Sequence, residues 1–172
     1  MTTLMTHAVI PIAIALAAPQ GLISSRLLGA GVLASLLPDA DMMGFYWGIP
    51  YSSELGHRGF THSILFAVAI ACCAAAACNS LRSRAYIAFL FVGMSCISHP
   101  LLDMLTSGGK GVALFWPFEK TRVLSSFRPV SAAPMNVARF FTDHGWQVFK
   151  SELFWIWLPF FSLALIVRFA RR

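Results

Sequence analysis

The chain has 172 residues, of which 58% are hydrophobic and only 12% are charged. A soluble domain of this size carries about 25% charged residues, so the composition excludes an ordinary soluble domain and indicates one integral membrane domain. The net charge of +6 is spread along the chain, which fits lipid headgroups and argues against a nucleic-acid surface.

The first apolar stretch covers residues 6–18 and is short for a membrane span, which needs about 20 residues. No Lys or Arg precedes Arg26. The stretch therefore lacks the basic flank of a secretory signal peptide, and we expect a helix of the mature protein. Its length predicts a helix that is tilted, re-entrant or partly covered by its neighbours.

The second apolar stretch covers residues 21–37 and ends at Pro38. Gly21, Ser25 and Gly29 recur in it at four-residue spacing. Small residues at this spacing let the backbone of another helix approach closely, so they predict a helix–helix contact along this face.

Three further apolar stretches cover residues 63–78, 85–105 and 153–169. Thr61 precedes the third stretch and is expected to cap its N-terminus. Tryptophans and arginines accompany the last stretch in the manner of interfacial anchors. Together the five stretches predict an all-α, polytopic membrane protein with about five apolar helices in a single domain, residues 1–172.

Residues 107–152 separate the last two apolar stretches and contain several glycines and prolines. This composition predicts a structured loop or lid rather than a span. The aromatic sequence LFWPF, residues 114–118, is expected to rest on the membrane surface. In the same loop, Arg122 and Arg128 are weaker candidates for contact with an anionic substrate, and His144 is expected to be an ordinary surface histidine.

A small set of charged and imidazole side chains lies near the ends of the apolar stretches. Such groups are costly close to a membrane core, so each is a candidate functional residue. These side chains lie at four places: the start of the first stretch, the end of the second, the start of the third and the end of the fourth. If the chain crosses the membrane alternately up and down, these four places fall on the same face of the membrane. The set consists of His7, Asp39, Asp41, His57, Arg58, His62, His99 and Asp103.

His99 and Asp103 are four residues apart and share one face of the fourth stretch. Imidazole and carboxylate groups are ligands of zinc and similar divalent ions, so a metal site is predicted where the four places meet. The spacing of Asp39 and Asp41 suits a turn in which one carboxylate binds the metal and the other acts as a base or supports a ligand. The alternatives are a polar seam between helices and an ordinary capped turn.

The segment GHRGFTHS, residues 56–63, contains the remaining candidates. His57 and His62 are five residues apart and would not share a face of one continuous helix. Because Gly59 interrupts the segment, His57 is expected to come from a loop and His62 from the first turn of the following helix. Arg58 carries a planar donor suited to a phosphate or carboxylate oxygen; the alternative is headgroup contact at the surface.

Four motifs resemble the bacterial LexA-regulated, membrane-bound metal-dependent hydrolases: MTH at residues 5–7, LLPDAD at 36–41, GHRGFTHS at 56–63 and SHPLLDMLTSGG at 98–109. The resemblance implies a multi-pass protein of the bacterial inner membrane, linked to the SOS response, with a divalent metal, zinc, as its cofactor. The ligands that the resemblance implies are His7, Asp39, His62, His99 and Asp103.

The sequence therefore predicts a metal-dependent hydrolase that acts on a phosphoester of a membrane lipid or lipid-linked substrate. Asp41 or His57 would move the proton, and Arg58 would hold a phosphate oxygen. We expect no nucleic-acid partner. The basic residues at the opposite helix ends favour a site outside the cytoplasm.

Two other functions stay open from the sequence. The main alternative is a metal-binding or ion-translocating membrane protein without hydrolytic activity. An ion pathway needs polar residues on both sides of the midplane, whereas here they gather on one face, which favours an enzyme site. A third alternative is a structural or regulatory protein whose helices share a polar seam.

Overall fold

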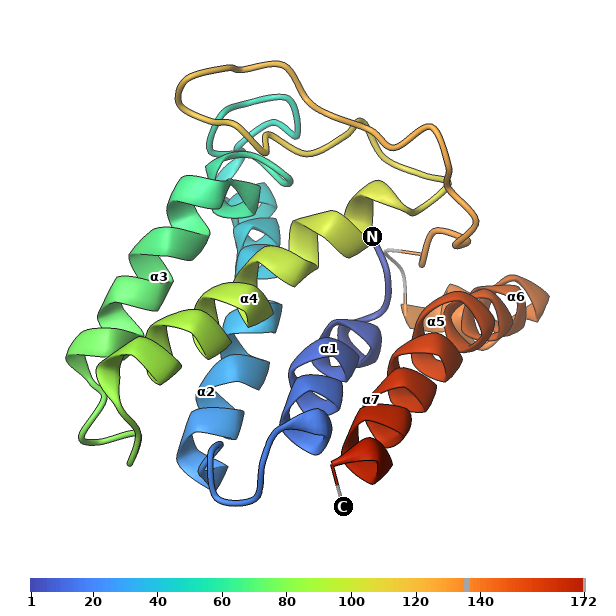
Figure 1. Cartoon of the computed structure of the whole chain (residues 1–172). Coiled ribbons are helices and arrows are strands. Elements are labelled where there is room, and N and C mark those ends of the chain that lie inside the picture. The colour runs from blue at the N-terminus through green and yellow to red at the C-terminus, as the bar shows by residue number, and fades with distance from the viewer. Residues whose placement is uncertain (135–136, 172) are drawn as a thin grey trace.

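The computed structural model describes residues 1–134 and 137–171. It is all-helical, as predicted; the described residues form no strand, and their extended segments meet only at isolated β-bridges. The α-helices are α1 (Leu4–Ala17), α2 (Ser25–Leu36), α3 (Ile64–Ala76), α4 (Ala85–Met104), α5 (Val137–Phe140), α6 (Asp143–Glu152) and α7 (Leu158–Ala170) (Figure 1). Two 3-10 segments, η1 (Leu37–Trp47) and η2 (Phe60–His62), and one π-helical segment, η3 (Leu153–Trp157), complete the helical elements.

Within residues 1–134 and 137–171, three helical segments are long and apolar enough to cross a membrane: Ser25–Trp47, Ala85–Met104 and Asp143–Ala170. The apolar helices α1 and α3 have only 14 and 13 residues. At a rise of 1.5 Å per residue each is about 20 Å long, shorter than the roughly 30 Å hydrocarbon core. The predicted helical membrane protein is confirmed, with two of its apolar helices too short to span the core unaided.

The second helix differs from the predicted range 21–37 at both ends. Gly21 has a φ of +78° and belongs to a turn, and α2 starts only where the Ser24 hydroxyl accepts a hydrogen bond from Leu27 N. At the other end the chain continues from α2 directly into η1. Pro38 does not stop it, because it occupies the first turn of η1, where the missing N–H is not needed.

The third helix is capped by Ser63, not by Thr61 as predicted. The Ser63 hydroxyl accepts a hydrogen bond from Phe66 N. Thr61 instead donates its hydroxyl to Asp41 at 2.7 Å. A hydroxyl expected to support a helix end therefore belongs to the polar network described below.

The last helix begins ten residues earlier than predicted. Elements α6, η3 and α7 follow one another without interruption from Asp143 to Ala170, so the predicted loop 107–152 ends before Asp143. The buried residues of α6 are Gly145, Val148 and Glu152, spaced three and four apart as in an amphipathic helix. A search for continuous apolar runs overlooks such a helix.

The glycines of α2 act differently from the prediction. A Cβ at Gly21 or Gly29 would meet no atom within 4 Å, so the predicted four-residue seam is not a packing face. Gly31 instead lies against α4, where a Cβ would come within 2.4 Å of Phe91 Cε1. The close approach of α2 and α4 therefore depends on Gly31.

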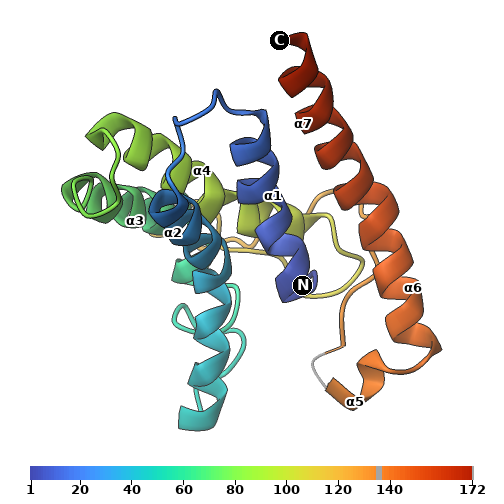
Figure 2. The ribbon, with the colours of Figure 1, turned by 90° about the horizontal axis from the view of Figure 1, so that it is seen from below.

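Two packed cores join the helices. The first joins α2, α3 and α4 through Leu27, Ala67 and Phe91. The second joins α1, α4 and η3 through Val9, Ile10, Leu102 and Ile156. Figure 2 shows α1 between the α2–α3–α4 group and the C-terminal helix.

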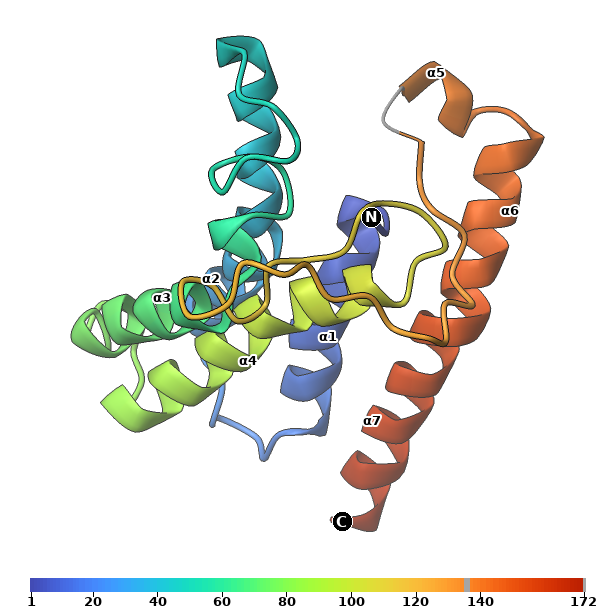
Figure 3. The ribbon, with the colours of Figure 1, turned by 90° about the horizontal axis from the view of Figure 1, so that it is seen from above.

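The helices run alternately between two ends of the molecule. The N-terminus, η1, η2 and the C-terminal end of α4 lie at one end, and the loop after α4 crosses above them (Figures 1 and 3). The turns after α1 and α3 and the C-terminus lie at the other end. We call these the site end and the distal end.

Candidate metal centre

Four buried side chains from three elements converge at the site end. Asp39 of η1, His62 of η2, and His99 and Asp103 of α4 each offer one ligand atom, and these atoms all lie within 4.8 Å of one another. We call this group the four-residue cluster.

The spacing of the cluster atoms suits a small cation. His99 Nε2 lies 3.3 Å from Asp39 Oδ1, and His62 Nε2 lies 3.9 Å from both Asp39 Oδ1 and Asp103 Oδ2. Ligand atoms at the vertices of a tetrahedral zinc site, with bonds of 2.0–2.1 Å, are separated by about 3.4 Å. These three separations lie within about 0.5 Å of that value, so they are compatible with a zinc site.

Three of these atoms, Asp39 Oδ1, His62 Nε2 and His99 Nε2, have no hydrogen-bond partner among the described residues. The fourth, Asp103 Oδ2, forms an ion pair with the guanidinium of Arg58 at 3.0 Å. Leaving a buried polar atom without a partner costs about 1–3 kcal/mol, so three such atoms around one point are unusual for a purely structural seam. The donor set of two imidazoles and two carboxylates fits a divalent ion such as zinc.

The outer nitrogens of both cluster histidines are engaged. His99 Nδ1 lies 2.7 Å from the carbonyl oxygen of Ser35, and His62 Nδ1 lies 3.2 Å from Asp41 Oδ2. A ring that donates from Nδ1 presents the lone pair of Nε2 to the cluster. Burial lowers the pKa of His62 against the opposing effect of Asp41, which favours the neutral imidazole that binds metals.

His7 lies beside the four-residue cluster rather than within it. Its ring stacks on that of His99, with centroids 3.6 Å apart. Its Nε2 is 2.8 Å from the Thr2 hydroxyl and 3.7 Å from Asp103 Oδ1, while Nδ1 has no partner. The structure shows His7 stacked on the ring of His99, a member of the cluster. The predicted role of His7 as a metal ligand stays a prediction.

Asp41 is fully engaged in hydrogen bonds, in contrast to Asp39. Its Oδ1 lies 2.7 Å from His57 Nδ1, and its Oδ2 accepts from the backbone N–H of Arg58 at 3.0 Å and from Thr61. Asp41, His57 and His62 are also close enough to form a second group around a metal. Because its oxygens already have partners, the arrangement favours Asp39 as a ligand and Asp41 as the support of His62.

Arg58 is packed inside the site end. Only 1% of the residue is exposed, which excludes the headgroup contact considered from the sequence. Its Nη2 lies 3.0 Å from Asp103 Oδ2, and its Nη1 donates to the Gly108 carbonyl at 3.2 Å. A Cβ at Gly109 would come within 2.1 Å of Nη1, so this glycine makes room for the guanidinium.

Arg122, a weaker candidate for substrate contact, instead holds backbone. It donates to the carbonyls of His57 at 2.9 Å, Tyr51 at 2.8 Å and Ser53 at 3.1 Å. These bonds fix the loop that leads into η2. Nothing in the local sequence indicated this use. His144 is exposed and contacts the Ala132 carbonyl at 3.2 Å, away from the cluster.

Glu152 is a buried carboxylate that the sequence analysis overlooked. It accepts hydrogen bonds from the Thr3 backbone and hydroxyl and, at 2.7 Å, from the Thr6 hydroxyl. The neighbouring Thr2 donates its N–H to Asp103 Oδ1 at 3.1 Å. Glu152 thus holds the segment that supports the cluster. Its position directly before the last apolar stretch was the available signal.

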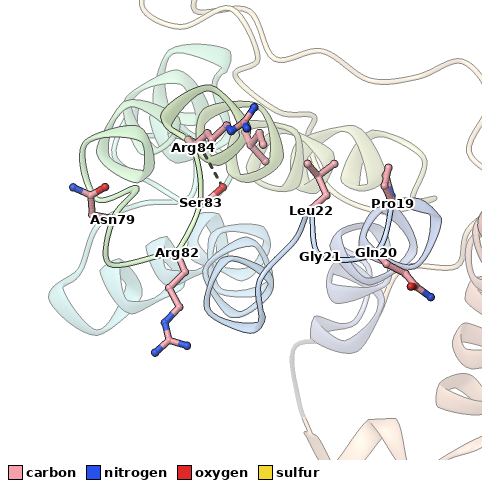
Figure 4. Close-up of a pocket in the computed structure, with 9 residues that line it drawn as sticks. Pro19, Gln20, Gly21, Leu22, Asn79, Arg82, Ser83 and Arg84 are labelled. Carbon is pink, nitrogen blue, oxygen red and sulfur yellow. Dashed lines mark hydrogen bonds between the residues drawn. The ribbon is translucent and has the colours of Figure 1, made fainter.

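The distal end contains a different kind of hollow, of about 670 Å³. It lies between the turns after α1 and α3 (Figure 4). None of the predicted site residues lines it; its polar lining includes Gln20, Asn79, Arg82 and Arg84.

Comparisons with known proteins agree with the membrane character of the chain. The family model described as "YdjM inner membrane protein" matches residues 1–172. The chain is 39% identical over 173 aligned residues to the inner membrane protein YbcI of Escherichia coli (strain K12), and the match covers the whole of both chains. No solved structure matches the chain significantly.

Proposed function

The chain belongs to the YdjM family of inner membrane proteins, and we propose that it acts there as a metal-dependent hydrolase. The observation that carries the proposal is the four-residue cluster, whose facing atoms are buried and close together, three of them without a hydrogen-bond partner among the described residues. Zinc is the ion that best suits this donor set.

We propose that Asp39, His62, His99 and Asp103 hold the ion and that His7 supports them from the side. When bound, such an ion lowers the pKa of a coordinated water to near 7 and polarises the bond under attack. Asp41 keeps His62 oriented through the contact at Nδ1.

The chain's own residues supply the proton chemistry. The side chains of His57 and Asp41 form a buried pair, with His57 Nδ1 2.7 Å from Asp41 Oδ1. Asp41 also contacts His62, which is a member of the four-residue cluster, so the pair is linked to the cluster through His62. An imidazole–carboxylate pair can accept a proton and pass it on. We therefore assign proton movement to this pair.

Arg58 is proposed to hold an anionic substrate oxygen. Its guanidinium lies against Asp103, and its Nε–H has no partner among the described residues. A preorganised cation beside the reacting centre stabilises charge that develops there. The substrate class that fits is a phosphoester of a membrane lipid or of a lipid-linked molecule, because the cluster lies at the helix ends of a membrane protein.

The test combines metal analysis with an activity panel. Purified protein is analysed by mass spectrometry for bound metal and then incubated with phospholipids and prenyl phosphates, with and without chelator. We expect about one zinc per chain and cleavage that the chelator removes. His99→Ala should abolish both, Arg58→Lys should keep the metal but weaken turnover, and His144→Ala should change neither.

The competing function is metal binding or ion translocation without hydrolysis. If the metal-loaded protein cleaves no member of the panel but dissipates a metal or proton gradient in liposomes, this alternative replaces the hydrolase. LexA control is an expectation from the sequence resemblance alone, and it is tested by measuring the transcript after DNA damage.

A further inference from the structure

A mostly apolar cavity of about 640 Å³ reaches the four-residue cluster from the side of the N-terminal segment. Its walls come from the N-terminal residues, from α2 and η1, and from Ala133, Pro134 and Phe140. Leu4, Met5, Leu36 and Met42 are among the apolar residues that line it. Its volume and lining are those of a site for a small organic ligand.

Among the described residues that line the cavity, Asp39 is the one with a charged side chain. Asp39 is 7% exposed, and neither of its carboxylate oxygens has a hydrogen-bond partner. The same carboxylate belongs to the four-residue cluster. One end of the cavity therefore meets the proposed reacting centre, while most of the rest of its wall is apolar.

The wall of the cavity is continuous with an exposed apolar surface. Leu4 and Met5 line it and are 55% and 75% exposed, and exposed apolar side chains of a membrane protein are suited to contact with hydrocarbon. A molecule in this cavity can thus have its apolar part toward the membrane and its polar part at Asp39.

Two other hollows provide a comparison. Across η1, a smaller cavity of about 380 Å³ is lined by Leu37 and Phe66 and reaches Asp41, whose oxygens already have partners. A third, of about 220 Å³, lies between α3 and α4 and has a wholly apolar wall. Of these three hollows in the described part of the chain, the larger apolar cavity is the one that combines mostly apolar walls with the carboxylate of Asp39, which has no hydrogen-bond partner there.

From these observations we propose that the cavity binds the hydrocarbon chain of the lipid substrate, with the phosphoester end at Asp39. The proposal rests on the proposed function for the choice of substrate. It adds where the chain of the lipid lies and which residues select it.

Photolabelling in a membrane tests the cavity directly. The full-length protein is placed in vesicles of phosphatidylethanolamine and phosphatidylglycerol that contain phosphatidic acid with a diazirine at the end of its acyl chain. After illumination, labelled peptides are identified by mass spectrometry. We expect labels on residues 1–5, 36–42 or 133–134 in excess of those on the outer faces of α3 and α7.

Adjacent leucines give a matched pair of variants. Leu36→Trp fills the larger cavity and should remove most of the excess label, whereas Leu37→Trp fills the smaller cavity and should leave it unchanged. Both variants must retain wild-type helix content by circular dichroism and wild-type zinc binding. If Leu36→Trp does not fold, the map of labels on the wild-type protein still decides between the outcomes.

The outcomes separate this inference from the proposed function. Cavity labelling without cleavage of any substrate supports lipid binding while contradicting the hydrolase. Cleavage without excess label in the cavity, or equal labelling of the Leu36→Trp and wild-type proteins, overturns the inference. His99→Ala should lose the metal but keep the label, because it does not line the cavity.

Discussion

The two ends of the helix bundle use their charged residues in opposite ways. At the distal end, Arg26 and Arg171 donate to the backbone carbonyls of Ser80 and Ala17, at 3.1 Å and 2.9 Å. These carbonyls follow or end a helix, where a cation offsets the partial negative charge of the helix dipole. At the site end, Arg58 is buried and its guanidinium faces the carboxylate of Asp103.

The difference shows which polar groups call for a functional explanation. Exposed arginines that donate to backbone carbonyls are an ordinary feature of helix ends that face headgroups and water. Buried carboxylates and imidazoles without partners are costly, so a stable protein keeps them only where a ligand or a reaction uses them. The size of a hollow does not make this distinction, because the open one at the distal end (Figure 4) is as large as the one that reaches Asp39.

The largest expected effect is a difference between the two ends in the side of the membrane from which an impermeant reagent reaches them. In a background without the four native cysteines, Ser52→Cys at the site end and Ser80→Cys at the distal end should react with an impermeant thiol reagent from opposite sides of the membrane. Intact cells and inverted vesicles give the two sides. Reaction of both cysteines from one side would contradict the placement of the ends on opposite faces, and the side that labels Ser52→Cys tests the expectation of a site outside the cytoplasm.

Asp103→Ala should combine loss of zinc with loss of stability. It removes a cluster carboxylate and leaves the buried Arg58 cation unpaired, which typically costs about 3–5 kcal/mol. The double variant Arg58→Met/Asp103→Leu removes both charges and should recover much of the stability but not the zinc. Thermal unfolding in detergent and metal analysis measure the two effects. Wild-type zinc content in Asp103→Ala would remove this residue from the ligand set.

Asp41→Ala should weaken metal binding without abolishing it. Asp41 supports His62 rather than facing the cluster, and loss of such a support costs about 10–100-fold in metal affinity. Competition with a chromogenic chelator measures the affinity, and Asp39→Ala, which should lose the metal altogether, is the comparison. Equal loss in both variants would indicate that the Asp41–His57–His62 group holds the ion.

Glu152→Gln should have a smaller effect that spreads from the last helix to the first. The amide retains the size of the carboxylate but replaces one of its two accepting oxygens with an NH2 donor, so at least one hydrogen bond from Thr3 or Thr6 is lost and we expect a loss of about 1–3 kcal/mol in stability. Zinc affinity should fall less than in Asp41→Ala. Glu119→Gln, in the exposed loop, is the control. An unchanged unfolding temperature in Glu152→Gln would show that this carboxylate is not needed to hold the N-terminal segment.

Arg84→Ala at the distal end should have the smallest effect of all. The side chain is exposed, and surface substitutions of this kind change stability by about 0.5 kcal/mol or less. Zinc content and lipid labelling should equal those of the wild-type protein. A loss of either would mean that the distal end takes part in the site and would break the contrast between the two ends.

The sequence predicted the apolar helices and the site end because both depend on local patterns. Continuous apolar runs revealed α1, α3 and α4, and their alternating path placed His7, His62 and His99 at one end. Amphipathic α6 has no such run. The capping role of Ser63, the close approach at Gly31 and the backbone contacts of Arg122 depend on which elements become neighbours, which local patterns do not contain.

The same limit applies within the site. Asp39 and Asp41 are equivalent in a sequence motif, and only their three-dimensional surroundings distinguish an unpartnered carboxylate from one that already accepts several hydrogen bonds. The spacing alone offered a ligand and a supporting residue without an order, and Asp39 was named as the ligand only through the family resemblance. The fold distinguishes the two carboxylates because the loop that carries His57 and Thr61 brings hydrogen-bond partners to Asp41.

The contacts of Glu152 also bear on how the protein is made. Glu152 lies 149 residues after Thr3, to which it is hydrogen-bonded, while every member of the four-residue cluster precedes residue 104. During synthesis, all of the cluster residues enter the membrane before the helix that fixes the N-terminal segment leaves the ribosome. The nascent chain therefore passes through a stage in which Asp103 and its neighbours are present but the segment beside them is still free to move. Insertion of the segment that carries Glu152 ends that stage, because its carboxylate accepts the hydrogen bonds of Thr3 and Thr6.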